Sequence, residues 1–153
     1  MVTSEKTIMI HRSVDEVFAS VCDLQNNPQW QKGLVEARRL TEGPLEIGTQ
    51  YANVRKYTPG RNLESAFQCT AYELNKKIAF KTLSSLWPYE DTYLFESIDG
   101  STRLTNRLEL QISGWITLAG PLIAFGLRSD MAANIRNLKD ILESRANPPR
   151  NDR

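Results

Sequence analysis

The sequence predicts an α+β domain in which a curved, seven-stranded antiparallel sheet wraps around one long C-terminal helix. Three observations lead to this class: turn signals recur between short strand-like segments, helical periodicity is confined to the two ends, and the chain has 153 residues. Domains cluster near ~100–150 residues, so residues 1–145 are assigned to a single domain. Residues 146–153, which include two prolines, are expected to form a disordered tail.

Near the N-terminus, a short strand over residues 7–10 is expected to precede two helices. Ser13 and Glu16 have the spacing of a capping box, in which two side chains bond free amides at the start of a helix. The apolar residues at positions 14, 17, 18 and 21 then follow helical spacing. Asp23 is placed to begin a second short helix, which Pro28 should end because proline lacks an amide hydrogen.

Six further strands are predicted in the middle of the chain, where turn-forming pairs such as Gly43-Pro44 and Asp99-Gly100 recur. Asp-Gly is typical of a hairpin, because the turn requires positive φ angles. The short connections imply that each strand runs antiparallel to the one before it. The strands are expected at residues 34–41, 48–57, 62–72, 77–84, 89–98 and 101–112.

A long helix is predicted over residues 118–145. Its second half is amphipathic and should pack one face against the sheet. A strongly twisted sheet curls, and one helix laid across the concave side need not fill the space beneath it, so we expect an internal cavity. The residues of the apolar stripe are Met131, Ile135, Leu138 and Leu142.

The first half of this helix, residues 118–127, is apolar nearly all round. We interpret it as a wall of the cavity, with Leu122 and Phe125 among the ligand contacts. A surface of this kind would also suit contact with a membrane or with a second copy of the chain, so a homodimer is a second interpretation.

Composition excludes several classes of protein. The 19 basic and 18 acidic side chains give a net charge of +1, whereas a dedicated nucleic-acid-binding domain is usually basic. Two cysteines and one histidine cannot supply the ligands of a tetrahedral zinc site, and no metal or other cofactor is predicted. The first ten residues lack the pattern of a signal peptide, and the longest apolar stretch, 115–127, is shorter than the ~20 residues of a membrane span. A cytoplasmic protein with reduced thiols is therefore expected.

Several short motifs follow one another along residues 5–145. They are Val14-x-x-Val17-Phe18, Asp23-x-x-x-x-Pro28-x-Trp30, Gly43-Pro44-x-x-x-Gly48-Thr49, Tyr93-x-Phe95-Glu96, Gly100-x-Thr102-Arg103-Leu104-Thr105 and Leu138-Lys139-x-x-Leu142-Glu143. In their order and spacing the chain resembles the START/birch-pollen-allergen (SRPBCC) superfamily, in particular its polyketide cyclase/dehydrase and lipid transport branch. The resemblance implies a helix-grip fold whose cavity holds a hydrophobic small molecule. It does not imply a reaction, because one fold supports many functions.

The alternation of side chains along each strand indicates which residues face the cavity. Asn106 is a lone amide among leucines, and a buried amide is costly without a partner, so it either anchors a ligand or bonds a neighbouring group. Trp30 and Trp87 lie in loops beside prolines and suit either a cavity rim or a structural plug. For the expected ligand contacts on the strands, core packing is the preferred interpretation. These are Phe67, Phe80, Tyr93 and Phe95. For Leu122 and Phe125 on the helix, core packing is the alternative to the cavity wall.

No catalytic constellation is evident, and only weak candidates for catalysis are present: Tyr51, Arg55, Asp91 and Tyr93. The guanidinium of Arg55 would suit an acidic ligand group, but the preferred interpretation places residues 51, 53 and 55 on the convex face of the sheet. Neighbouring strand residues point to opposite faces, so Glu90 and Asp91 cannot act as a pair and are expected to lie in a solvated turn. Cys69 would need a nearby base to act as a nucleophile.

We therefore predict that the chain binds a hydrophobic small molecule, such as a lipid, isoprenoid or polyketide-like compound, for transport or sequestration. One alternative is a polyketide cyclase or dehydratase that acts on an aromatic or polyketide substrate in the same cavity. Another is a module that binds a partner protein. The first is preferred because the fold signature is complete whereas a catalytic set is missing.

Overall fold

The computed structural model describes residues 1–85 and 87–145, and its elements follow the predicted order. Strand β1 (Val2–Ile10) precedes helix α1 (Val14–Cys22) and the 3-10 helix η1 (Leu24–Gln29). The six strands of the meander are β2 (Leu34–Arg39), β3 (Gln50–Thr58), β4 (Arg61–Glu73), β5 (Lys77–Ser84), β6 (Tyr89–Ile98) and β7 (Ser101–Leu110). The 3-10 helix η2 (Gly114–Ala119) and helix α2 (Gly120–Ser144) complete the domain. The tail predicted at 146–153 lies outside the described residues.

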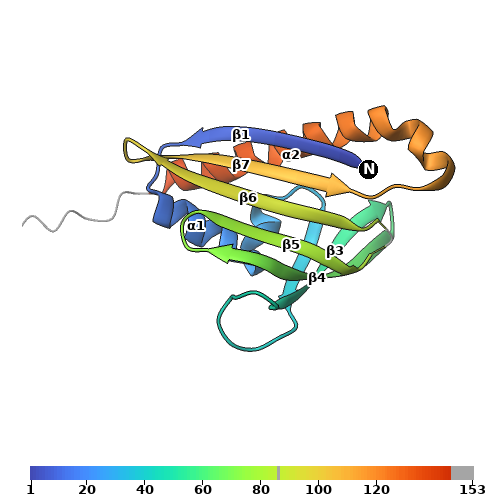
Figure 1. The fold of residues 1–153 in the computed structure, drawn as a ribbon, viewed down its shortest axis with the longest axis horizontal. Coiled ribbons are helices and arrows are strands. Elements are labelled where there is room, and N and C mark those ends of the chain that lie inside the picture. The colour runs from blue at the N-terminus through green and yellow to red at the C-terminus, as the bar shows by residue number, and fades with distance from the viewer. Residues whose placement is uncertain (86, 146–153) are drawn as a thin grey trace, which may run out of the picture.

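The seven strands form one antiparallel sheet in the order β1-β7-β6-β5-β4-β3-β2. Consecutive strands of the meander are neighbours, while β1 pairs with β7, the last strand, and forms one edge of the sheet. Helix α2 runs behind β1 and β7. Helix α1 lies at the left end of the sheet, below β6 in this view (Figure 1). The arrangement confirms the α+β class and agrees with a helix-grip fold.

The N-terminal elements differ from prediction in three details. Strand β1 begins at Val2 rather than at residue 7, because it pairs with β7 along its whole length. Ser13 begins α1, but its side chain makes no capping hydrogen bond; the backbone oxygen accepts one from Val17 N instead. Pro28 lies inside η1 rather than ending it, and in so short a helix its missing amide removes a single backbone hydrogen bond.

The core lies between the concave face of the sheet, α1 and the second half of α2. The predicted stripe of α2 is confirmed, because all four of its residues are buried. The ring of Phe18 on α1 makes edge-to-face contacts with Tyr72 and Phe95, whose ring centroids lie 5.7 Å and 5.0 Å away. Phe18 therefore supplies the aromatic contacts of α1 with the sheet, beside the buried Val17 and Val21.

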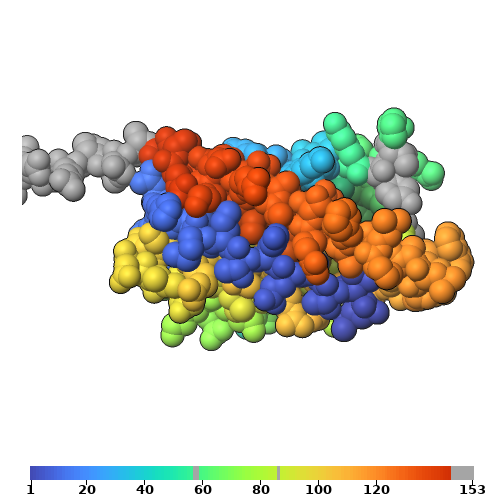
Figure 2. All heavy atoms as spheres, turned by 90° about the horizontal axis from the view of Figure 1, so that it is seen from above, coloured from blue at the N-terminus to red at the C-terminus, as the bar shows by residue number. Residues whose placement is uncertain are grey.

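The start of the C-terminal helical segment lies outside the core. It is divided by Gly120-Pro121 into η2 and α2, and its first turns extend past the end of the sheet (Figures 1 and 2). The interpretation of Leu122 and Phe125 as cavity wall is therefore wrong, and contact with a membrane or a second copy stays a prediction. Four large apolar side chains of this segment are between 72% and 87% exposed: Trp115, Leu118, Leu122 and Phe125. Among the described helices, none is long and apolar enough to cross a membrane.

Polar contacts join the C-terminal end of α2 to the turn after β1. The guanidinium of Arg12 donates to the backbone oxygens of Leu142, Glu143 and Arg145, at 2.8 Å, 3.3 Å and 2.5 Å. Lys139 Nζ donates to the oxygen of Met9 at 2.6 Å. Carbonyls at the end of a helix have no partner within it, so Arg12 supplies part of what they lack.

Candidate functional site

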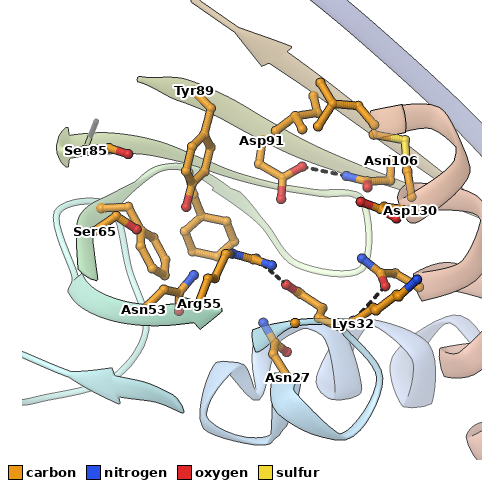
Figure 3. Close-up of a pocket in the computed structure, with 18 of the residues that line it drawn as sticks. Asn27, Lys32, Asn53, Arg55, Ser65, Ser85, Tyr89, Asp91, Asn106 and Asp130 are labelled. Atoms are coloured by element: carbon orange, nitrogen blue, oxygen red, sulfur yellow. Dashed lines mark hydrogen bonds between the residues drawn. The ribbon is translucent and has the colours of Figure 1, made fainter. Parts of the chain in front are cut away.

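A cavity of about 380 Å³ lies between the concave face of the sheet and the middle of α2. Strands β3 to β7 form one wall, η1 and the connection to β2 form the floor, and Leu127, Met131 and Asn134 of α2 form the opposite side (Figure 3). The cavity begins where α2 diverges from the sheet, beyond the well-packed part of the core.

Six of the nine residues expected to contact a ligand line this cavity: Trp30, Phe67, Phe80, Trp87, Tyr93 and Asn106. Phe95 faces the same side of the sheet but packs against Phe18 in the core. Leu122 and Phe125 point into solvent. Alternation along the strands thus located the sheet residues, whereas composition misplaced those of the helix.

Strand β3 contributes polar groups that the preferred interpretation had placed on the convex face. That interpretation is wrong, because Asn53 and Arg55 line the cavity. Tyr51 lies on the same face but deeper, stacked on Phe67 at 5.6 Å between ring centroids. The β3–β4 register pairs Tyr51 with Phe67 and Asn53 with Ser65. Since paired residues share a face, the expected inward position of Phe67 was the signal that could have placed all three β3 residues correctly.

Several residues that line the cavity were not predicted. Ser65 and Tyr89 follow from the same alternation as Phe67 and Tyr93, two and four residues away on their strands. Asn27 and Lys32 belong to η1 and the loop after it, where no periodic pattern exists. Asn27 is only 8% exposed, and its side-chain oxygen has no hydrogen-bond donor among the described residues.

Asp91 and Asn106 form a polar pair in the wall of the cavity. Asn106 Nδ2 donates to Asp91 Oδ1 at 2.6 Å and to the backbone oxygen of Thr92 at 3.2 Å (Figure 3). Of the two interpretations of Asn106, the bond to a neighbouring group is observed. The expectation that Asp91 lies in a solvated turn is wrong, because it lies within strand β6, paired with Leu108 of β7, and lines the cavity.

Burial raises the pKa of Asp91 to about 6, because the carboxylate loses hydration. Hydrogen bonds from Asn106 and Tyr93 and the charge of Arg55 act in the opposite direction but are weaker. The pKa of Tyr93 is well above its ordinary value, owing first to burial and then to the nearby Asp91. Asp91 can therefore gain or lose a proton close to neutral pH, as groups at functional sites often do.

The raised pKa predicts a pH-dependent contribution of Asp91 to stability. The folded chain holds this proton more tightly than the unfolded chain, so the contribution is full below pH ~4 and is lost as the pH rises through about 6. We expect Asp91→Asn to raise the free energy of unfolding by about 3 kcal/mol at pH 8, and to change it by less than ~1 kcal/mol at pH 4. Urea unfolding of both proteins at the two pH values measures the difference. An equal difference at both would contradict the prediction.

Arg55 is one of the cations that line the cavity. Its Nη2 donates to Gln31 Oε1 at 2.7 Å. Within residues 1–85 and 87–145, no ion pair includes Arg55. Its guanidinium lies between the phenol of Tyr89 and the carboxyl of Asp91 (Figure 3). The site thus combines one guanidinium with hydrogen-bonding groups and a proton-exchanging acid.

Neither cysteine belongs to the cavity, and both are free thiols. Burial raises the pKa of Cys22 to about 12 and also raises that of Cys69. Since only the thiolate reacts, we expect 5,5′-dithiobis(2-nitrobenzoate) to modify the folded protein slower than a model thiol by roughly two orders of magnitude. Both thiols should react at once in 6 M guanidinium chloride. Rapid reaction of either thiol in the folded protein would contradict this prediction.

No cluster of metal-binding side chains occurs in the described part of the chain. The groups that the cavity offers to a ligand are its aromatic walls and the polar side chains of β3, β6 and β7.

Comparison with known proteins gives a consistent family and fold. The family model described as "Polyketide cyclase / dehydrase and lipid transport" matches residues 1–143. No curated protein matches the chain closely enough to count as a relative. Among solved structures, a START superfamily protein from Mycobacterium smegmatis superposes with a TM-score of 0.79 at 15% identity, over 92% of this chain and 97% of the other.

Two further structures show the same fold. Protein TTHA0849 from Thermus thermophilus has a TM-score of 0.78 and 13% identity, covering 94% of this chain and 99% of its own. The Zhui aromatase/cyclase from Streptomyces sp. R1128 has a TM-score of 0.74 and 13% identity, covering 92% and 93%. At these identities the likeness establishes the fold alone.

Proposed function

Because the chain belongs to the polyketide cyclase/dehydrase and lipid transport family, we propose that it binds a hydrophobic small molecule in its cavity, for transport or sequestration. The observation that carries the proposal is the cavity of about 380 Å³, within the ~300–1,000 Å³ typical of small-molecule sites. Trp30, Phe67, Phe80 and Trp87 offer it aromatic surface. Burying apolar surface contributes ~25 cal/mol per Å² before the costs of ordering the ligand.

The walls also indicate that the ligand is not purely apolar. Asn53, Arg55, Tyr89 and Asp91 bring polar atoms to the same space (Figure 3). Polar groups in a largely apolar site fix the orientation of a ligand and select among ligands. A hydrocarbon without hydrogen-bonding atoms would exclude water from these groups without offering them a hydrogen bond in return, which is costly.

The test is to identify what the purified protein carries and to block the cavity. Native mass spectrometry, followed by extraction, should reveal a bound small molecule, and a panel of acyl, isoprenoid and aromatic compounds should raise the melting temperature. Ser65→Phe places a ring inside the cavity and should abolish both effects. Ser97→Phe, the same change at an exposed site on β6, should not. If no compound in the panel stabilises the unaltered protein, the proposal fails.

A specific observation also favours the alternative, a cyclase or dehydratase for an aromatic or polyketide substrate. Asp91 exchanges its proton near neutral pH and lies beside Tyr93, while Arg55 can stabilise a developing oxyanion. Turnover of such a substrate, lost in Asp91→Asn while the fold is retained, would establish catalysis. Equal turnover by Asp91→Asn would exclude Asp91 as its acid or base.

A further inference from the structure

We infer that the cavity takes a ligand with one carboxylate on an apolar, ring-containing body, and that Asp91 takes up a proton when the ligand carboxylate binds at Arg55. The inference rests on the proposed function and names the chemical class of the ligand. It goes beyond family membership, because it depends on charges that this chain places in its own cavity.

The first step is the balance of charge on the cavity wall. Three cations line it, Lys32, Arg55 and Lys56, and none of them takes part in an ion pair among the described residues. Of the three carboxylates that line it, Glu64 is paired with Arg38 at 2.5 Å. The remaining two are Asp91 and Asp130. The cavity is therefore left with an excess of cationic groups, which favours an anionic group on the ligand.

The second step concerns where the anion binds. Among the described residues, the guanidinium of Arg55 donates a hydrogen bond to an uncharged side chain, Gln31, and it points into the centre of the space (Figure 3). A guanidinium presents five donors in a planar fork that matches a carboxylate. The phenol of Tyr89 lies beside it and can add a hydrogen bond. Aromatic rings of Phe67, Phe80 and Trp30 line the adjoining wall and suit an apolar ring.

The third step concerns the proton. A ligand carboxylate at Arg55 would share the cavity with the carboxyl of Asp91, and two neighbouring carboxylates cannot both remain ionised without a large penalty. Asp91 already holds its proton unusually tightly, because it is buried. The groups that face it are Arg55 from β3, Tyr89 and Tyr93 from β6, Asn106 from β7, and Asp130 and Lys32 across the cavity. Asp91 is the carboxyl whose pKa burial already raises, so the proton goes to Asp91.

The experiment compares 2-naphthylacetate with 2-naphthaleneethanol, which has the same rings but no charge. Isothermal titration calorimetry in phosphate and in Tris at equal pH counts the protons taken up. We expect 2-naphthylacetate to bind at least tenfold more tightly than the alcohol at pH 7, with uptake approaching one proton per ligand at pH 8. Its Kd should rise about tenfold per pH unit above pH 7, while the Kd of the alcohol stays constant.

Two pairs of variants separate the roles of the side chains. Arg55→Gln should remove the preference for the acid, whereas Arg55→Lys should keep part of it. Asp91→Asn should keep the preference but remove both proton uptake and the pH dependence of Kd, while Asp130→Asn, the other unpaired carboxyl, should leave both in place. Circular dichroism and thermal unfolding check that each variant folds.

The outcomes distinguish this inference from the function on which it rests. If the alcohol binds as tightly as the acid, or if Asp91→Asn still takes up a proton, the inference is overturned while binding in the cavity stands. If neither probe binds and no compound of the wider panel stabilises the protein, both fail together.

Discussion

Replacing Phe18 with alanine is expected to lower the free energy of unfolding by about 3–5 kcal/mol, the usual range for removal of a buried phenylalanine. The side chain is 3% exposed and is the residue through which α1 contacts Tyr72 and Phe95. Its loss leaves a cavity between a nine-residue helix and the sheet, and so short a helix has little stability without packing. Urea unfolding followed by circular dichroism measures the change.

A matched control is available on the opposite face of β6. Leu94 is 43% exposed, so Leu94→Ala removes a large apolar side chain without opening the core, and we expect a change below ~1 kcal/mol. Similar effects of the two substitutions would mean that Phe18 does not hold α1 to the sheet.

The second large effect is expected for Arg12→Ala, which should destabilise the protein by about 2–4 kcal/mol. Three backbone carbonyls at the end of α2 lose a charged donor, and hydrogen bonds to charged groups contribute about 1.5–3 kcal/mol each when well shielded from water. The bond to the Leu142 oxygen is partly buried, so it should account for most of the loss.

Hydrogen exchange provides a local readout for this substitution. The amides of the last turns of α2 and of β1 should exchange faster in Arg12→Ala, while those of β4 and β5 should change only as much as global stability does. Arg136→Ala removes an exposed arginine from the middle of α2 and serves as the control. Unchanged exchange at the end of α2 in Arg12→Ala would contradict the proposed role.

The strands could be predicted closely because their signals are local. Asp99 adopts a φ of +49° and Gly100 one of +81°, as the predicted Asp-Gly turn requires. Alternation then placed Phe67, Phe80, Tyr93 and Asn106 on the inner face. Turn chemistry and the two-residue period of a strand depend only on neighbouring residues, and a sequence displays both.

The errors arose where position depends on how elements meet. The apolar composition of residues 118–127 could not reveal that the helical segment is divided into η2 and α2 at Gly120-Pro121. Nor could it reveal that the first turns of α2 pass beyond the sheet. Asp91 looked solvated because a charged residue beside Glu90 near a turn usually is. Its inward position follows from strand alternation, but its bond to Asn106 requires the pairing of β6 with β7. The functional centre was thus the part that local signals described least well.

The pairing of β1 with β7 has a consequence for the speed of folding. The two strands are neighbours in the sheet although α1 and the rest of the meander separate them along the chain. Pairing of this non-local kind is slow, because the intervening chain must lose conformational entropy before the contact stabilises it. Until the two strands meet, β1 presents unpaired backbone amides and carbonyls, and intermediates of this kind are prone to aggregate.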